Sequence, residues 1–334
     1  MGLSPEITAG AVISGAYFGD KSSPLSDSAN LAAAAAGVDL YQHVRETFLT
    51  SLVTLPLALA VFWYLGEPGD FDASEKINAI NDLFGISPVL FLPLVLVVVL
   101  AVMKLPPFAA IFIGTLAGAV LAVFIAPERV IAFAGGDGLP RPVALLKGVW
   151  LALASGYKSS TGDAAIDQLI SRGGMESMLN TIWLIITALA FGGVVEKVGV
   201  LDRLITPIID AAKSTGTLVA ALVASVVTTN LVTADQYIAI VLPGRMFKNG
   251  FRARGLAPVV LSRAVGDSAT VTGALIPWNS CGAYMAATLG VATFSYAPFA
   301  VFCWLSPLVT IAFAYAGVRM LPLEKSPERP VEAS

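Results

Sequence analysis

The sequence predicts an all-α polytopic membrane protein, and three observations lead to this fold class. Hydrophobic residues make up 56% of the 334 residues and charged residues only 13%, whereas a soluble domain carries about 25% charged residues. Several apolar runs approach the roughly 20 residues that cross a bilayer as a helix. Three further apolar stretches are interrupted by clusters of polar residues, which predicts transmembrane helices that break at membrane depth.

The composition also argues against several classes of function. The net charge is −3 and no long basic tract is present, so nothing indicates a nucleic-acid partner. Cys281 and Cys303 lie far apart in apolar surroundings, and with a single histidine they form no zinc signature. We therefore expect no cofactor.

The first broken element covers residues 5–38. An apolar run gives way to a polar cluster, and the chain turns apolar again before residue 38. The cluster supplies four candidate ion-binding side chains: Asp20, Ser26, Asp27 and Asn30. Pro24 lies among them, and because proline donates no amide hydrogen bond and clashes with the preceding turn, it predicts a helix end. Ionisable side chains are costly inside a membrane and usually mark the pathway of an ion or a substrate.

The continuous spans are read from the uninterrupted apolar runs. They are residues 44–65, 86–103, 107–126, 142–156, 178–195 and 294–318. Residues 66–85 are polar and acidic, and residues 157–177 have a weak apolar face that predicts a position along the membrane interface. Residues 1–318 are expected to form one transmembrane domain, followed by a polar tail at residues 319–334.

Two more broken elements lie in the second half of the chain, at residues 217–243 and 255–290. Their polar interruptions supply five more candidate ion-binding side chains: Asn230, Asp235, Asp267, Thr272 and Asn279. Pro243 is expected to end the first of these two elements, because a proline interrupts the hydrogen bonding of a helix.

The distribution of basic residues orients the helices. The loop predicted at residues 245–254 holds four basic residues and no acidic one, and basic loops stay in the cytoplasm. Counting spans from this loop places residues 66–85 outside and the C-terminus in the cytoplasm. The same count makes the broken elements at 5–38 and 255–290 antiparallel.

These two antiparallel elements also resemble each other in sequence. Both contain a Gly-Asp pair, at residues 19–20 and 266–267. In both, a proline precedes a Gly-Val pair by thirteen residues, in PLSDSANLAAAAAGV and PWNSCGAYMAATLGV. An antiparallel pair of similar broken elements predicts an inverted-repeat secondary transporter, whose breaks meet near the middle of the membrane.

The chemistry expected at the breaks is exchange of a cation for a proton. A broken helix exposes free N–H and carbonyl groups, and carboxylate, hydroxyl and amide oxygens are the ligands that hard cations prefer. A carboxylate in a low-dielectric site holds a proton or a cation, but not both. Asp27 is the preferred shared carboxylate, because Lys21 is expected to keep its neighbour Asp20 ionised. His43 is expected at the membrane interface rather than in a proton path.

Three motifs resemble the NhaC-type sodium/proton antiporter family of the ion-transporter superfamily. In chain order they are GAYFGDKSSPLSDSANLAAAAAG, TTNLVTADQYIAIVLPGRMF and LSRAVGDSATVTGALIPWNSCGAYMAATLGV. The Gly-Asp-Lys-x-Ser-Pro-Leu-Ser-Asp motif of that family matches residues 19–27. Family members carry further helices upstream of this motif, so the first repeat of this chain is expected to be incomplete.

The resemblance implies a transporter of the inner membrane that exchanges Na⁺ for H⁺ and serves pH homeostasis, with Na⁺ at Asp27 and Asp267. Its partners are then the lipid bilayer and the two ions. The resemblance does not decide whether the protein forms a homodimer. Because relatives exchange malate for lactate with coupled Na⁺ and H⁺, an organic-acid antiporter is one alternative. A truncated or partner-dependent subunit is another.

An enzyme is the competing class. Two aspartates that each follow a glycine, Asp20 and Asp267, suggest an intramembrane aspartyl protease. Such proteases resemble Gly-x-Gly-Asp at one aspartate and Tyr-Asp at the other. Here Tyr17 and Ala264 stand two residues before the glycines, and the chain has no Tyr-Asp pair. We therefore expect a transporter and not an enzyme.

Overall fold

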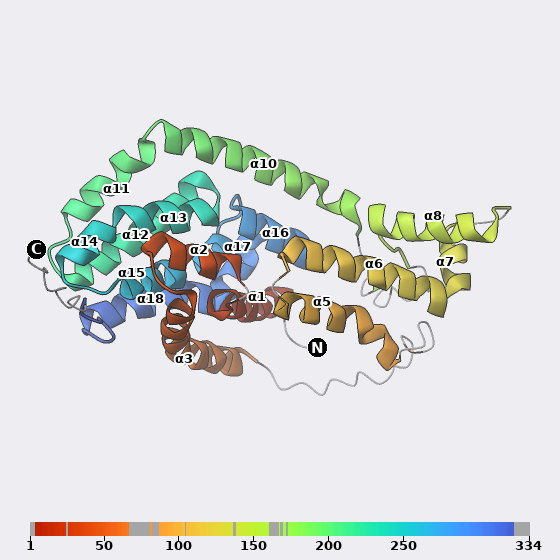
Figure 1. The fold of residues 1–334 in the computed structure, drawn as a ribbon, viewed down its shortest axis with the longest axis horizontal. Helices are drawn as coiled ribbons and strands as arrows, with labels where there is room; N and C mark the ends of the chain where they lie inside the picture. The colour runs from red at the N-terminus through yellow and green to blue at the C-terminus, as the bar shows by residue number, and fades with distance from the viewer. Residues whose placement is uncertain are drawn as a thin grey trace, which may run out of the picture. The chain divides into compact units, whose positions relative to one another are not determined.

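The computed structural model of the chain is built from helices (Figure 1). It describes residues 4–24, 26–66, 81, 87–103, 105–135, 138–159, 167, 170–171 and 173–323, and within these ranges it contains no β-strand. The predicted all-α fold class is confirmed. Most of residues 66–85 and the greater part of residues 157–177 lie outside the described residues, so the predictions made for them are not assessed.

The chain divides into two compact units, which are described separately. The small unit is Gly69–Ile182, and the large unit combines Gly2–Pro68 with Trp183–Ser334. The helices of the small unit are η1 (Pro88–Phe91), α5 (Leu92–Val102), α6 (Pro107–Ile125), α7 (Pro127–Phe133) and α8 (Arg141–Ala154). Within it, α5 packs along α6 and α7 packs against α8 (Figure 1). The single transmembrane domain over residues 1–318 stays a prediction.

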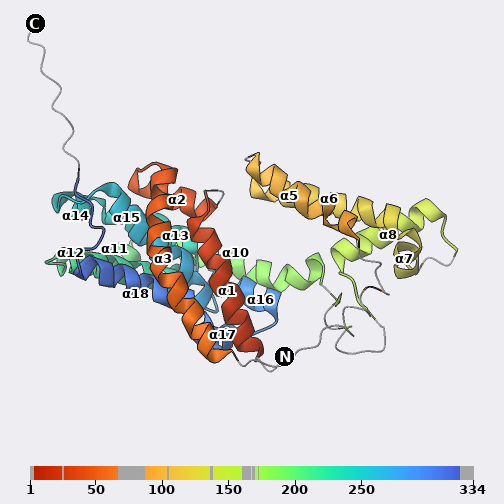
Figure 2. The same cartoon turned by 90° about the horizontal axis from the view of Figure 1, so that it is seen from below.

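The large unit brings the two ends of the chain together. Its helices are α1 (Pro5–Ser22), α2 (Asp27–Ala36), α3 (Leu40–Leu65), α11 (Val200–Asp210), α12 (Thr215–Thr233), α13 (Gln236–Met246), α14 (Lys248–Ala253), α15 (Pro258–Val265), the π-helix η2 (Gly266–Thr270), η3 (Gly273–Leu275), α16 (Ser280–Leu289), α17 (Thr293–Tyr296), η4 (Ala297–Phe299) and α18 (Val301–Tyr315), while α10 (Met175–Lys197) has residues in both units. α1 and α3 pack against α18, and α2 packs against α13 and α15 (Figure 2).

Several helices have the length and composition of membrane spans. Among the described residues these are α3, Phe108–Ile125 of α6, α10 and α12. Two bent helix pairs, Pro258–Leu275 with Ser280–Leu289 and Thr293–Phe299 with Val301–Tyr315, raise the number of spans from four to six if each pair crosses once. The chain is therefore a multi-pass membrane protein with broken helices.

The first break, residues 23–26, separates α1 from α2. Ser23 is extended, and the Ser26 hydroxyl caps α2 by accepting the amide hydrogen of Ala29 at 3.3 Å. Pro24 stands in this connection and has no amide hydrogen to continue the ladder of α1. The helix therefore ends where Pro24 predicts.

The second break, residues 234–235, separates α12 from α13. Ala234 takes a left-handed conformation with φ of 58°, which is costly for a residue with a Cβ. The carboxylate of Asp235 then caps α13 by accepting the amide hydrogen of Ile238 at 2.9 Å. Asp235 thus interrupts the apolar run because its carboxylate binds an amide that is left free at the start of α13.

The third break, residues 276–279, bends the chain by 51° before α16 begins. The Asn279 side chain caps α16 by accepting the amide hydrogen of Cys281 at 3.0 Å. The amide of Ser280 donates to the carbonyl of Ala234 at 2.9 Å. A main-chain hydrogen bond therefore joins the second break to the third.

Two predicted elements need correction. α13 continues through Pro243 to Met246 and α14 follows, so residues 245–254 are largely helical rather than a loop. Pro243 lies near the end of α13, where it removes only one main-chain hydrogen bond. Residues 294–318 are not one straight span either, because the helices on the two sides of Ala300 meet at 54°.

The face of α3 that packs into the large unit is polar. Its buried residues are His43, Glu46, Thr47, Thr50, Ser51, Thr54 and Ala58, and their spacing of three or four residues places them on one side of the helix. The opposite side exposes large apolar residues such as Leu52, Leu59 and Trp63. In a membrane the polar stripe therefore faces protein and the apolar side faces lipid.

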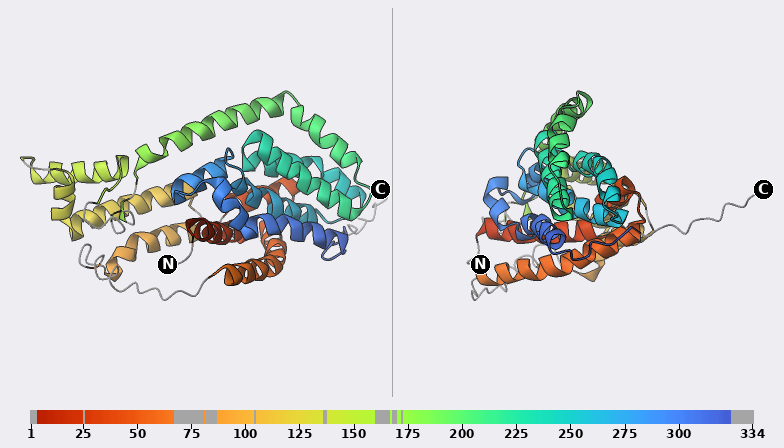
Figure 3. Two further views of the ribbon diagram at one scale, coloured as in Figure 1. Left: turned by 180° about the vertical axis from the view of Figure 1, so that it is seen from behind. Right: turned by 90° about the vertical axis from the view of Figure 1, so that its left-hand side faces the viewer.

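The π-helix η2 lies where the broken elements meet. It packs against α1, α2, α3, α12, α13 and α18, and all five of its residues are buried. Figure 3 shows from two further sides how the N-terminal helices, in red and orange, lie against the C-terminal helices in blue. Because π-helices are frequent at functional sites, this meeting point is the first place to look for one.

Candidate functional site

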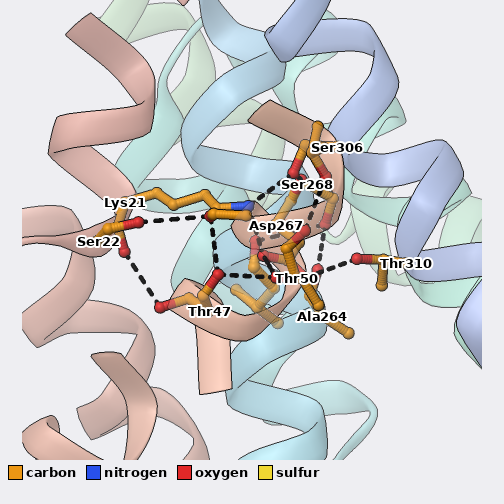
Figure 4. Close-up of polar contacts among 12 residues, drawn as sticks. Lys21, Ser22, Thr47, Thr50, Ala264, Asp267, Ser268, Ser306 and Thr310 are labelled. Atoms are coloured by element: carbon orange, nitrogen blue, oxygen red, sulfur yellow. Dashed lines mark hydrogen bonds and ion pairs between the residues drawn. The ribbon is translucent and has the colours of Figure 1, made fainter. Parts of the chain in front are cut away.

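A buried ion pair joins the first element to η2 (Figure 4). Lys21 Nζ lies 2.8 Å from Asp267 Oδ1, and neither side chain is exposed to solvent. Lys21 also donates to Ser306 Oγ at 2.9 Å, and Ser306 donates to the Asp267 carbonyl at the same distance. The Asp267 carboxylate accepts from Thr50 at 2.9 Å and from Thr310 at 2.6 Å. Both charges are thus compensated inside the protein.

This pairing corrects the expectation that Lys21 keeps Asp20 ionised. Lys21 reaches Asp267 instead, because consecutive residues of an α-helix point about 100° apart and only one of the two faces η2. Lys21 therefore gives no reason to prefer Asp27 to Asp20 as the shared carboxylate. The first element meets the third through Lys21 and Asp267, and not through either of its own aspartates.

The partly buried carboxylate of Asp20 bridges the first break. It accepts hydrogen bonds from the hydroxyl of Ser26 at 2.7 Å and from that of Ser28 at 3.0 Å. The two hydroxyls are themselves 2.9 Å apart. None of the ion pairs formed by the described residues includes Asp20. We call Asp20, Ser26 and Ser28 the Asp20 cluster; it offers only oxygen atoms.

Asp27 and Asn30 are exposed, unlike the other site residues predicted from the first element. Asp27 accepts the hydroxyl hydrogen of Tyr237 at 2.6 Å, which ties α2 to α13. Asn30 donates to the carbonyl of Ser26 at 2.7 Å. The structure thus places Asp27 and Asp267 in different surroundings, and the assignment of Na⁺ to both stays a prediction.

Three predicted residues form a buried amide cluster between the second and third breaks. The side chain of Asn230 donates to the carbonyl of Ala269 at 3.1 Å and to the hydroxyl of Thr272 at 2.9 Å. Asn279 donates in turn to the side-chain oxygen of Asn230 at 3.1 Å. Asp235, a further predicted residue, is 3% exposed and caps α13. These contacts stabilise the breaks and use the polar atoms predicted as ion ligands.

A second charged cluster was not predicted from the sequence. Glu46 of α3 pairs with Arg263 at 3.5 Å and with Arg319 through two hydrogen bonds. Arg263 is 1% exposed and also donates to the Arg319 carbonyl at 3.1 Å. We call these three residues the Glu46 cluster.

The polar face of α3 is the feature that the sequence reasoning missed. The apolar run at residues 44–65 predicts an ordinary span, but four hydroxyl residues recur at helical spacing within it: Thr47, Thr50, Ser51 and Thr54. That spacing was the available signal. His43 on this face is completely buried in the protein, and its predicted position at the membrane interface stays a prediction.

Comparison with known proteins finds a family of Na⁺/H⁺ antiporters and two relatives with that name. A family model described as the Na⁺/H⁺ antiporter family matches residues 15–318. The chain is 35% identical over 322 residues to the Na⁺/H⁺ antiporter NhaC of Alkalihalophilus pseudofirmus, covering 95% of this chain and 66% of that protein. It is 34% identical over 321 residues to the Na⁺/H⁺ antiporter NhaC of Bacillus subtilis, covering 94% and 67%.

A relative with another transported substrate is similar at the same level. The chain is 33% identical over 323 residues to the malate-2H⁺/Na⁺-lactate antiporter of Bacillus subtilis, covering 95% of this chain and 66% of that protein. The chain thus spans about two thirds of the length of these curated relatives. No solved structure matches it.

Proposed function

This chain belongs to the Na⁺/H⁺ antiporter family, and on that premise we propose that it exchanges Na⁺ for H⁺ across the inner membrane. Na⁺ and H⁺ are the transported ions, and the proposal involves no enzymatic step and no cofactor. Orientation follows the basic segment 245–254, which places this segment and the C-terminus in the cytoplasm.

The Asp20 cluster is the observation that carries this proposal. A carboxylate and two serine hydroxyls meet at a helix break with no cationic partner among the described residues. A carboxylate away from bulk water binds a proton more readily, and the same oxygens are ligands that a hard cation prefers. A hydroxyl that donates to the carboxylate can also turn its lone pairs toward a cation. The cluster can therefore hold H⁺ or Na⁺ in turn.

Lys21 and Asp267 then have a different role from Asp20. Their charges cancel within 2.8 Å, Asp267 Oδ1 also accepts from Thr50, and the other carboxylate oxygen accepts from Thr310. A cation entering there would have to displace the Lys21 ammonium. Asp20 needs no such displacement, so we propose Asp20 in place of Asp27 as the exchanged carboxylate.

The test is exchange by the purified chain in proteoliposomes. An outward Na⁺ gradient should drive protons inward, as a pH dye inside the vesicles reports. Asp20→Asn keeps the shape of the side chain and removes its titration, so it should abolish this signal. Asp27→Asn, which alters an exposed carboxylate, is the matched control and should keep it. Exchange at the parental rate by folded Asp20→Asn protein would overturn the assignment.

The same vesicles separate the alternatives. Na⁺-driven uptake of labelled malate or lactate would favour an organic-acid antiporter, the function named for one relative. A folded parental chain that moves neither ion would favour a subunit that needs a partner, since the chain covers 66% of the first relative.

A further inference from the structure

The chain has one histidine, and it lies inside the large unit. His43 is on the polar face of α3 and is completely excluded from solvent. Its Nδ1 atom lies 2.6 Å from the Ser262 hydroxyl of α15. Ser262 donates its own hydrogen to the carbonyl of Ala32 in α2, at 3.1 Å. The Ser262 hydroxyl is therefore the middle of a contact that joins the imidazole on α3 to α15 and α2.

These two hydrogen bonds favour one tautomer of His43. A serine hydroxyl has a single hydrogen to donate, and the Ala32 carbonyl next to Ser262 can only accept it. We therefore assign Nδ1 of His43 as the donor to Ser262. In a neutral imidazole the other nitrogen is a bare acceptor, and Nε2 of His43 is buried with no hydrogen-bond partner among the described residues. A buried acceptor left unpaired is costly.

The bare nitrogen lies next to the buried ion pair. The ring packs over Gly266, where a Cβ atom would be 2.8 Å from Cε1 and 3.3 Å from Nε2 of His43. Glycine at this position therefore makes room for the imidazole, one residue before Asp267. On the same face of α3, Thr50 follows two turns later and donates to Asp267.

Charged groups surround His43 on several elements. α1 contributes Lys21, η2 contributes Asp267, and α15 contributes Arg263. On α3 itself the next turn carries Glu46, which is paired with Arg263 and Arg319. The acidic residue of α2, Asp27, lies at the helix start away from Ala32, and α18 carries no acidic or basic residue.

A pocket lies beside the residues of α3 that flank His43. Gln42, Arg45 and Glu46 line it from α3, together with Pro258 of α15 and Leu321 near the end of the described chain. Glu46 is 6% exposed. The polar face of α3 thus carries His43, then Glu46 in the wall of the pocket, and then Thr50, which donates to Asp267.

We propose that His43 is a proton-binding site of the exchange, loaded through Nε2 from the Glu46 side of α3. The incoming proton adds to the lone pair of Nε2 and gives an imidazolium that keeps its Nδ1–H bond to Ser262; the same proton leaves from Nε2. This inference rests on the proposed function, because the bound proton is one that exchanges for Na⁺. Na⁺ bound at the Asp20 cluster lies at Ser28, one helical turn before Ala32 in α2, and its positive charge disfavours the imidazolium. Na⁺ and the His43 proton therefore oppose each other.

The test uses the fact that one histidine gives one imidazole signal. Protein labelled with ¹⁵N-histidine and purified without a histidine tag is titrated with acid in lipid nanodiscs, in Na⁺ and in choline. The Nδ1–H tautomer should give way to imidazolium, with a midpoint about one pH unit lower in Na⁺, a tenfold coupling of the usual size for linked sites. An Nε2–H tautomer, or a midpoint that Na⁺ does not move, would overturn the proposal.

Two variants show whether the signal belongs to the buried position. His43→Asn keeps an N–H donor for Ser262 and removes the titrating nitrogen, so its exchange should lose its dependence on pH across that midpoint. Adding Tyr41→His places the only imidazole on the exposed side of α3, where Tyr41 is 64% exposed. Its midpoint should be the same in Na⁺ and in choline; an equal Na⁺ shift there would be a general salt effect and would overturn the inference.

The failure of the inference and that of the proposed function can be told apart. If the parental chain exchanges Na⁺ for H⁺ but His43→Asn shows an unchanged pH profile, the His43 proposal is wrong and the function stands. If the chain exchanges neither ion and Na⁺ leaves the His43 midpoint in place, both are wrong.

Discussion

Lys21 Nζ lies 2.8 Å from Asp267 Oδ1, and both side chains are completely excluded from solvent. The pair joins the last turn of α1 to η2, so the first broken element is held to the third by two opposite charges. Its neighbours Thr50, Ser306 and Thr310 supply further hydrogen bonds to the two groups.

Breaking this pair should destabilise the protein strongly. Lys21→Met leaves Asp267 as an unpaired buried charge, and removal of one partner of a buried pair costs about 3–5 kcal/mol. The double variant Lys21→Met with Asp267→Asn should recover part of the loss, because neither charge remains. Unfolding in detergent, followed for the parent and these variants as a double-mutant cycle, measures the coupling.

The exposed pair of Arg141 and Glu128 is the matched control for that cycle. Its atoms are 3.0 Å apart, but the side chains are 65% and 78% exposed, and exposed pairs contribute about 0–1 kcal/mol. Arg141→Gln should therefore leave the unfolding midpoint almost unchanged. Equal losses for Arg141→Gln and Lys21→Met would contradict the role of burial.

Ser28 should affect ion affinity while the cap of α2 stays in place. Its hydroxyl donates to Asp20 but does not cap α2, whereas Ser26 does both. A hydrogen bond to a charged group is worth about 1.5–3 kcal/mol, so Ser28→Ala should raise the KM for Na⁺ about tenfold or more and lower stability by no more than this hydrogen bond. Ser26→Ala should add a capping loss of about 1 kcal/mol. Exchange rates at graded Na⁺ with parallel melting curves test both, and an unchanged KM in Ser28→Ala would remove the Asp20 cluster from the ion path.

A single methyl group should disrupt the third break. A Cβ at Gly282 would lie 2.0 Å from the carbonyl oxygen of Ile276, so Gly282→Ala forces the backbone of the break to move. Gly15 in α1 has no atom within 4 Å of the same position, and Gly15→Ala should be neutral or stabilising by about 0.5–1 kcal/mol. Thermal melting temperatures of the two variants test this. A Gly282→Ala protein as stable as Gly15→Ala would contradict the close approach of Gly282 to the Ile276 carbonyl.

The orientation can be measured with two asparagines. Asn249 in α14 and Asn81 are both exposed, and the basic segment around Asn249 is expected in the cytoplasm. In a background free of Cys281 and Cys303, Asn249→Cys should react with an impermeant maleimide only in inside-out vesicles, and Asn81→Cys only in whole cells. Labelling of both positions from the same side would reverse the count of spans.

The helix breaks could be predicted because their causes are local. Pro24 cannot continue a helix, and Asp235 and Asn279 are side chains that cap a new one. The partner of Lys21 could not be predicted, because it depends on which face of α1 meets a residue at the other end of the chain. The bend at Ala300 lacks a cluster of polar residues, but Pro298 just before it is a local signal of the same kind as Pro24.

The hydrogen bond from the Ser280 amide to the Ala234 carbonyl has a mechanical consequence. With Asn279 bonded to Asn230 as well, the second and third breaks are joined by main-chain and side-chain hydrogen bonds. In the proposed exchange we therefore expect these two breaks to move together. An ion route that opens by their separation would first have to break these hydrogen bonds.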